Sequence, residues 1–98
     1  MNKYFIIFFK PGEAWIEGKS VFEQPLDDHV RFLKHLYNKG IVTMAGPLHD
    51  GSSGVTILRS VSLQQATELV NKDPDVIRKV LTPEVKQWQP LDFEAVEA

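Results

Sequence analysis

The spacing of apolar and polar residues changes several times along this chain. Each change predicts the start of another helix, strand or connection. Residues 4–9 (YFIIFF) are continuously apolar and are followed by Pro11-Gly12. Such a run is typical of a strand buried on both faces, so it predicts a central strand. Residues 11–24 show neither helical nor strand spacing. A connection of this length in a small domain is either a functional flap or a surface excursion.

Residues 26–38 carry apolar side chains at helical spacing, and Gly40 supplies the left-handed residue that commonly follows a helix. On a helical wheel, with about 100° per residue, the apolar arc contains His29 together with Leu26, Val30, Leu33, Leu36 and Tyr37. His35 falls on the polar side of the same wheel. The pattern therefore predicts that His29 faces the protein interior and that His35 faces water.

Two further strands with a tight turn between them are expected next. Residues 41–48 form the first, and Gly46-Pro47 near its end favours an edge position or a bend. The Asp50-Gly51 signal then turns the chain into a strand over residues 55–59 (VTILR). A hairpin is the simplest interpretation.

The last third of the chain predicts one more helix and one more strand. Ser62 and Gln65 match a capping box, which begins a helix that continues to about Lys72. Asp73-Pro74 ends it and can start a short further turn, with Asp73 as the N-cap. Residues 85–90 (VKQWQP) alternate well enough to form the closing strand.

The resulting order of elements predicts an α+β, ferredoxin-like βαββαβ domain over residues 1–98. Its four-stranded antiparallel sheet would carry both helices on one face. The other face would be bare, although the first strand is apolar on both sides. Because large exposed apolar faces are rarely left to water, we expect a homodimer formed through the sheet face.

Composition and charge exclude several classes of protein. The net charge of -2 offers no basic face for a phosphate backbone, so no nucleic-acid partner is expected. An RNA-recognition domain shares the strand order, but the third strand lacks the aromatic side chains on which bases stack. The apolar run at residues 4–9 is shorter than a signal-peptide core, and no run is long enough for a membrane span. We therefore predict a cytoplasmic protein with no membrane association.

Several short motifs, in this order, resemble the YciI-like (YCII-related) family. They are His29 early in the first helix, GIVTMAGPL at residues 40–48, Asp73-Pro74 after the second helix, and Trp88 in the closing strand. Similar proteins are dimeric α+β barrels related to muconolactone isomerase-like folds, and one branch eliminates chloride from a chlorinated hydroxyquinol. The resemblance implies a cleft in which His29 and Asp73 are the active-site residues.

Each of these two residues also has a structural interpretation. His29 could act as a general base or acid, since desolvation favours the neutral imidazole, or it could be a core histidine hydrogen-bonded to the backbone. Asp73 could orient that imidazole if it lies within hydrogen-bond reach. It could equally cap the helix that follows it. The two roles of Asp73 are compatible.

Three residues are candidates for substrate binding. Trp15, in the long connection, could wall an apolar pocket as part of a lid, or belong to the core or a dimer interface. Gly46 and Pro47 could contact a ligand through backbone groups, although shaping the strand end is their simpler role. The three histidines lack a metal-binding spacing, and no dinucleotide or phosphate-binding loop occurs, so we expect no metal and no cofactor.

These observations favour a cofactor-independent small-molecule enzyme of the lyase or isomerase type, with proton transfer by His29 and Asp73. The alternative is a non-catalytic dimeric module that binds a metabolite in the same cleft or has only a structural role.

Overall fold

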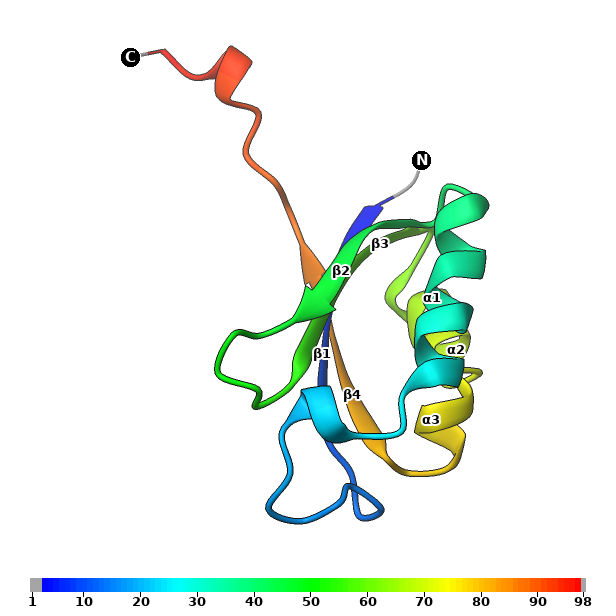
Figure 1. Ribbon diagram of the computed structural model, residues 1–98. Coiled ribbons are helices and arrows are strands. Elements are labelled where there is room, and N and C mark those ends of the chain that lie inside the picture. The colour runs from blue at the N-terminus through cyan, green and yellow to red at the C-terminus, as the bar shows by residue number, and fades with distance from the viewer. Residues whose placement is uncertain (1–2, 98) are drawn as a thin grey trace.

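The computed structural model describes residues 3–97 as one antiparallel sheet with helices on one side (Figure 1). The strands are β1 (Lys3–Pro11), β2 (Val42–Pro47), β3 (Gly54–Ser60) and β4 (Leu81–Trp88). The helices are α1 (Asp27–Asn38), α2 (Leu63–Val70) and the short α3 (Pro74–Ile77), and two 3₁₀ turns are η1 (Val21–Glu23) and η2 (Phe93–Ala95).

The sheet contains four strands in the order β2-β3-β1-β4, and every neighbouring pair is antiparallel. The predicted ferredoxin-like α+β fold is therefore confirmed. The first strand takes the central place that its apolar run predicted. β2 lies at one edge, which fits the Gly46-Pro47 dipeptide at its end, because proline cannot donate to a second neighbour.

The core lies between the sheet and the helices. Phe5, Ile7 and Phe9 of β1 are almost completely buried on this side. They pack with residues of the neighbouring strands and helices, namely Leu36, Val42, Leu58, Ala66, Val70 and Leu81.

The opposite face of the sheet is not covered within the chain. The alternate residues of β1, Tyr4, Ile6 and Phe8, are only half-buried. All helices lie on the same side, so this face is bare within one chain, as the predicted fold requires (Figure 1). The burial of β1 on both faces, which its apolar run indicated, does not occur within a single chain. In the strand register, Ile6 pairs with Ile57 and Phe8 with Val55, so these four side chains form a continuous apolar surface.

The closing strand begins earlier than the sequence pattern predicted. β4 starts at Leu81, which pairs with Pro11, whereas we expected a start at Val85. Thr82 and Pro83 interrupt the alternation in the sequence, but the neighbouring β1 extends far enough to pair with them. Lys79, with a φ of 65°, turns the chain into this strand.

The second helix is shorter than predicted but begins as expected. Ser62 accepts a hydrogen bond from the Gln65 backbone N–H at 3.1 Å, which is the predicted N-cap. α2 ends at Val70, two residues before the expected Lys72. Within residues 3–97, no helix has the length and apolar character needed to cross a bilayer.

Candidate active site

The structure brings His29 and Asp73 into direct contact, although they are 44 positions apart. His29 lies in the first turn of α1, and Asp73 immediately precedes α3. The imidazole Nδ1 of His29 contacts Oδ2 of Asp73. His29 is 8% exposed and Asp73 is fully buried, whereas His35 lies on the exposed side of α1. The predicted inward orientation of His29 and outward orientation of His35 are confirmed.

This contact determines which nitrogen of the imidazole is free. With an ionised Asp73, Nδ1–H donates to the carboxylate and the lone pair of the neutral ring is left on Nε2. Within residues 3–97, no buried side-chain nitrogen or oxygen lacks a hydrogen-bond partner. Nε2 makes no hydrogen bond there, so this atom is accessible to solvent. The imidazole is therefore held at one nitrogen and available at the other.

The aromatic ring of Phe9 restricts the imidazole from another direction. The ring centroids of Phe9 and His29 are 4.7 Å apart with an interplanar angle of 71°. This edge-to-face arrangement is favourable for aromatic pairs. Because Phe9 is itself buried in the core, it gives the imidazole a rigid apolar neighbour.

Asp73 uses its two carboxylate oxygens for different tasks. While Oδ2 contacts His29, Oδ1 accepts a hydrogen bond from the Asp75 backbone N–H at 2.9 Å. The second bond makes Asp73 the N-cap of α3, as the sequence predicted. The capping role and the contact with the imidazole thus coexist. The hydrogen bond that caps α3 also holds the Asp73 carboxylate in position next to the imidazole.

Asp75 is a member of this site that sequence analysis missed. The first turn of α1 has no side-chain cap of its own, since its N-cap residue is Leu26. Instead, Oδ2 of the fully buried Asp75 accepts the backbone N–H of His29 at 3.0 Å. A carboxylate at this position satisfies an otherwise unpaired donor and interacts favourably with the helix dipole. Asp75 thus caps α1 from a distant part of the chain.

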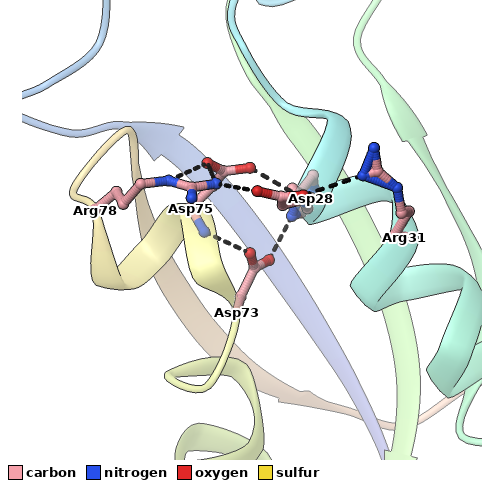
Figure 2. A network of polar contacts seen from close by, with 6 residues as sticks. Asp28, Arg31, Asp73, Asp75 and Arg78 are labelled. Atoms are coloured by element: carbon pink, nitrogen blue, oxygen red, sulfur yellow. Dashed lines mark hydrogen bonds and ion pairs between the residues drawn. The ribbon is translucent and has the colours of Figure 1, made fainter.

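A chain of ion pairs continues from Asp75 to the surface (Figure 2). Arg78 donates to Asp75 Oδ1 through Nε at 3.2 Å and through Nη2 at 2.8 Å. Its Nη2 also donates to Asp28 Oδ2 at 2.8 Å, and Asp28 in turn accepts from Arg31 at 3.1 Å. The network links the end of α3 to the first turn of α1.

The charges in this network shift each other's protonation equilibria. The hydrogen bond with Asp75 is the largest cause that raises the pKa of Arg78, followed by the bond with Asp28. The hydrogen bond from Arg78 likewise lowers the pKa of the Asp28 carboxyl. The spacing of Asp75 and Arg78 could have indicated a helical ion pair. Nothing in the sequence indicated the hydrogen bond between the Asp75 carboxylate and the His29 backbone N–H.

A cleft of about 730 Å³ opens beside His29. It lies between α1, η1 and the strands β2 and β3, and its volume is within the range of roughly 300–1,000 Å³ common for small-molecule sites. The lining is mainly apolar and includes Phe9, Val21, Phe22, Leu26, Val30, Leu33, Val42, Met44, Ala45 and Val55. His29 lines this cleft, as do Gly46 and Pro47. Three of the five candidate residues, His29, Gly46 and Pro47, therefore line one cavity. Asp73 does not line it but contacts His29.

Trp15 lies elsewhere. It is half-buried against the core, its Nε1 donates to the Lys19 carbonyl at 3.1 Å, and it is not among the residues that line the cleft. Another residue of the same connection, Gln24, does line it. The Gln24 amide bonds both backbone groups of Ile16 and the Lys19 carbonyl, at 2.8, 3.0 and 3.2 Å. Gln24 therefore ties the connection to one end of the cleft, a role that no sequence pattern suggested.

Two residues of the predicted buried arc of α1 are exposed. Val30 and Tyr37 are both more than half exposed, and both line the cleft. The helical wheel correctly placed Val30 and Tyr37 on the apolar face of α1. The sheet covers only part of that face, which includes His29 and Leu36. The exposure of Val30 and Tyr37 gives the cleft an apolar margin. Within residues 3–97, no group of three or more His, Cys, Asp and Glu side chains is arranged to hold a metal ion.

Comparisons with known proteins agree with the fold. No family model matches the chain, and no curated protein matches it. Among solved structures, it is similar to the 5-chloro-2-hydroxyhydroquinone dehydrochlorinase from Burkholderia phenoliruptrix AC1100 in complex with 2,5-dihydroxybenzoquinone. The match covers 88% of this chain and 93% of that chain, with a TM-score of 0.62 and 18% sequence identity. The likeness supports the fold class, and membership of the YciI-like family stays a prediction.

Proposed function

We propose that this protein is a cofactor-independent enzyme of the lyase or isomerase type, in which His29 transfers a proton to and from a small molecule bound in the cleft. The observation that carries the proposal is the buried contact between His29 Nδ1 and Asp73 at the wall of an apolar cavity. This arrangement supplies a base with one orientation and one accessible nitrogen.

The chemistry assigned to each group follows from the geometry. Nε2 of His29 accepts a proton from an acidic C–H or O–H of the substrate. The electron pair left on the substrate then either takes the proton back at another atom, which is an isomerisation, or expels a leaving group with its bonding electrons, which is an elimination. The carboxylate of Asp73 stabilises the imidazolium formed in the first step and keeps the ring in place. Gly46 and Pro47 are proposed to contact the substrate from β2.

The apolar lining favours a flat ring compound, and the proposed base requires that this compound carry an ionisable hydrogen. The structural neighbour's name supports this choice, because that protein is a dehydrochlorinase solved with a dihydroxybenzoquinone. We extend to this chain only the class of compound, a hydroxylated six-membered ring. Membership of the YciI-like family and a cytoplasmic location belong to the same proposal. A direct role for Trp15 in binding has no support from its position.

Deuterium exchange tests the proposal without knowledge of the natural reaction. The probe is 2,5-dihydroxybenzoquinone, whose ring C–H groups are followed by proton NMR in deuterated buffer. Exchange requires the deuterated imidazole to deliver a deuteron to an enol carbon of the ring, after which the neutral imidazole removes the original proton from the resulting sp³ carbon. We expect the protein to accelerate the exchange, and His29→Gln to reduce the acceleration by about 10²-fold or more, as for loss of a general base. Asp73→Asn keeps a capping side chain but removes the charge, so it should give an intermediate loss. His35→Gln, on the exposed side of the same helix, is the matched control.

The alternative is a non-catalytic metabolite-binding or structural module. In that case neither the wild type nor His29→Gln would accelerate exchange, whether or not the probe binds. Equal acceleration by the wild type and by a folded His29→Gln variant would also contradict the proposal, because the base would then lie elsewhere.

We also propose that the protein forms a homodimer through the bare face of its sheet. Support comes from the apolar surface that Ile6, Phe8, Val55 and Ile57 form opposite the helices. Specific interfaces commonly bury about 800 Å² on each partner, and a face-to-face arrangement would cover this surface. Sedimentation velocity should find a dimer for the wild type and a monomer for Ile6→Lys.

A further inference from the structure

The segment after β4 leaves the body of the protein. Beyond Trp88 the chain runs outward on the side of the sheet opposite the helices and ends in the η2 turn (Figure 1). We call residues 89–97 the C-terminal arm. Every residue from 91 to 97 is exposed, and the hydrogen bonds described for these residues connect them only with one another.

The dimensions of the molecule reflect this projection. Its principal axes measure 47, 28 and 21 Å, and its radius of gyration is 14.3 Å. A compact chain of this length has a radius of gyration of about 13 Å. The excess is what a segment standing away from a compact body would produce. Residues 91–97, which are all exposed, therefore contribute little to packing within their own chain.

The composition of the arm is unusual for a segment surrounded by water. Leu91 and Phe93 are 69% and 74% exposed, and Val96 is also more than half exposed. The turn that presents them is ordered by a local cap, since Asp92 accepts the Glu94 backbone N–H at 3.1 Å. Several large apolar side chains exposed within one short segment are typical of a binding site for another protein. The arm thus presents an apolar surface without a matching surface of its own chain.

The bare sheet face has the complementary chemistry. Besides its apolar centre, it carries Arg59 and Lys86, which pair with Tyr4 and Ile6 in the strand register and so point to the same side. Neither cation forms an ion pair within residues 3–97. The arm carries three carboxylates, Asp92, Glu94 and Glu97, and no basic residue.

We propose that the arm of each copy packs against the sheet face of a second copy, so that two subunits exchange arms. Leu91 and Phe93 would lie on the apolar surface of the partner, and the arm carboxylates would face the cations at its margin. A second copy is the occupant because the arm runs out on the side of the bare face, and the two surfaces match in polarity and charge. The inference rests on the homodimer proposed above.

Sedimentation velocity over a range of concentrations tests the contribution of the arm. The variant is the full chain with Leu91→Ser and Phe93→Ser, and the control is Ile77→Ser, which removes an apolar side chain that is 66% exposed on α3. We expect the double variant to raise the dimer dissociation constant at least tenfold and the control to leave it unchanged. Circular dichroism should show the same fold for all three proteins, because the substituted side chains are exposed.

A charge exchange and a cross-link make the test specific for the proposed contact. Glu94→Lys should weaken the dimer, and Lys86→Glu in the same chain should restore part of the loss if the two side chains meet. The chain has no cysteine, so a Phe93→Cys protein mixed with an Ile6→Cys protein should yield the mixed disulfide as the main product.

The outcomes separate the two proposals. A wild type that stays monomeric at all concentrations would overturn both the homodimer and the arm exchange. If the wild type is dimeric and Ile6→Lys is monomeric, but the double arm variant has an unchanged dissociation constant, the dimer stands and the arm exchange is wrong. Neither result depends on the proton-transfer activity proposed for His29.

Discussion

The backbone N–H of His29 donates a hydrogen bond to Asp75 Oδ2 at 3.0 Å, across 46 positions of the chain. The residue that we propose as the base is consequently held at two points, its ring by Asp73 and its backbone by Asp75. Since Asp73 also caps α3 through the Asp75 backbone N–H, the two aspartates on either side of Pro74 connect α1 and α3 at the site. Preorganisation of this kind is a general requirement for catalysis.

Removal of the Asp75 carboxylate should destabilise the protein. Asp75→Ala leaves the His29 N–H without an acceptor in a buried position and breaks the ion pair with Arg78, so we expect a loss of about 3 kcal/mol in the free energy of unfolding. Urea denaturation measures this change. Asp27→Ala replaces an exposed aspartate in the same first turn and should have little effect. If the free energy of unfolding falls as little for Asp75→Ala as for Asp27→Ala, α1 does not depend on the Asp75 carboxylate.

Asp28 should stabilise the protein in a pH-dependent way. Its hydrogen bond with Arg78 lowers the pKa of Asp28 below the ordinary value of 3.8. A folded-state pKa below the unfolded one means that the stabilisation is present above pH 3.8 and disappears as the pH falls through the lowered value. The effect is small because both partners are about half exposed.

Thermal melts of the wild type and Asp28→Asn provide the measurement for that prediction. The melting temperature of the variant should be slightly lower at neutral pH, and the difference should vanish in acid and shrink in high salt. Glu17→Gln, an exposed residue outside the ion pairs of residues 3–97, serves as the comparison. If the difference in melting temperature between the wild type and Asp28→Asn grows toward low pH, the predicted stabilisation by the ionised Asp28 is wrong.

Gly12 should not tolerate a side chain. A Cβ atom at this position would lie 2.2 Å from the Lys79 carbonyl oxygen, a distance that requires the backbone to move. We expect Gly12→Ala to cost about 2 kcal/mol, as for other overpacked positions, and to lower the melting temperature. Gly46→Ala is the matched control, because nothing lies within 4 Å of its added Cβ. The backbone N–H of Gly12 also donates to the Val80 carbonyl at 3.0 Å. A variant with unchanged stability would mean that the connection after β1 does not pack closely against the turn between α3 and β4.

Gln24 should order the connection between β1 and α1. Gln24→Ala removes the bonds to both backbone groups of Ile16, and loss of a buried hydrogen-bonding partner costs about 1–3 kcal/mol. Hydrogen exchange should accelerate within residues 12–24 and stay unchanged in the strands. Gln65→Ala, with an exposed side chain on α2, should not alter exchange in this segment. Uniform acceleration across the sheet would indicate global destabilisation instead.

The sequence by itself determined the order of the elements, the central place of the first strand, the inward side of His29 and the capping role of Asp73. Each of these depends on residues a few positions apart, because helical and strand periods and N-caps are local relationships. The sequence pattern also placed Val30 and Tyr37 on the same helix face as His29. It could not show how far the covering sheet extends, so their exposure was not foreseen.

Only the tertiary structure decided which distant groups meet. The contact of His29 with Asp73, the capping of α1 by Asp75 and the separation of Trp15 from the cleft all depend on how α1, α3 and the first connection pack together. The early start of β4 was decided in the same way, by the length of the neighbouring β1. Such contacts join residues tens of positions apart and leave no period in the sequence, because they are set by the packing of whole elements against one core.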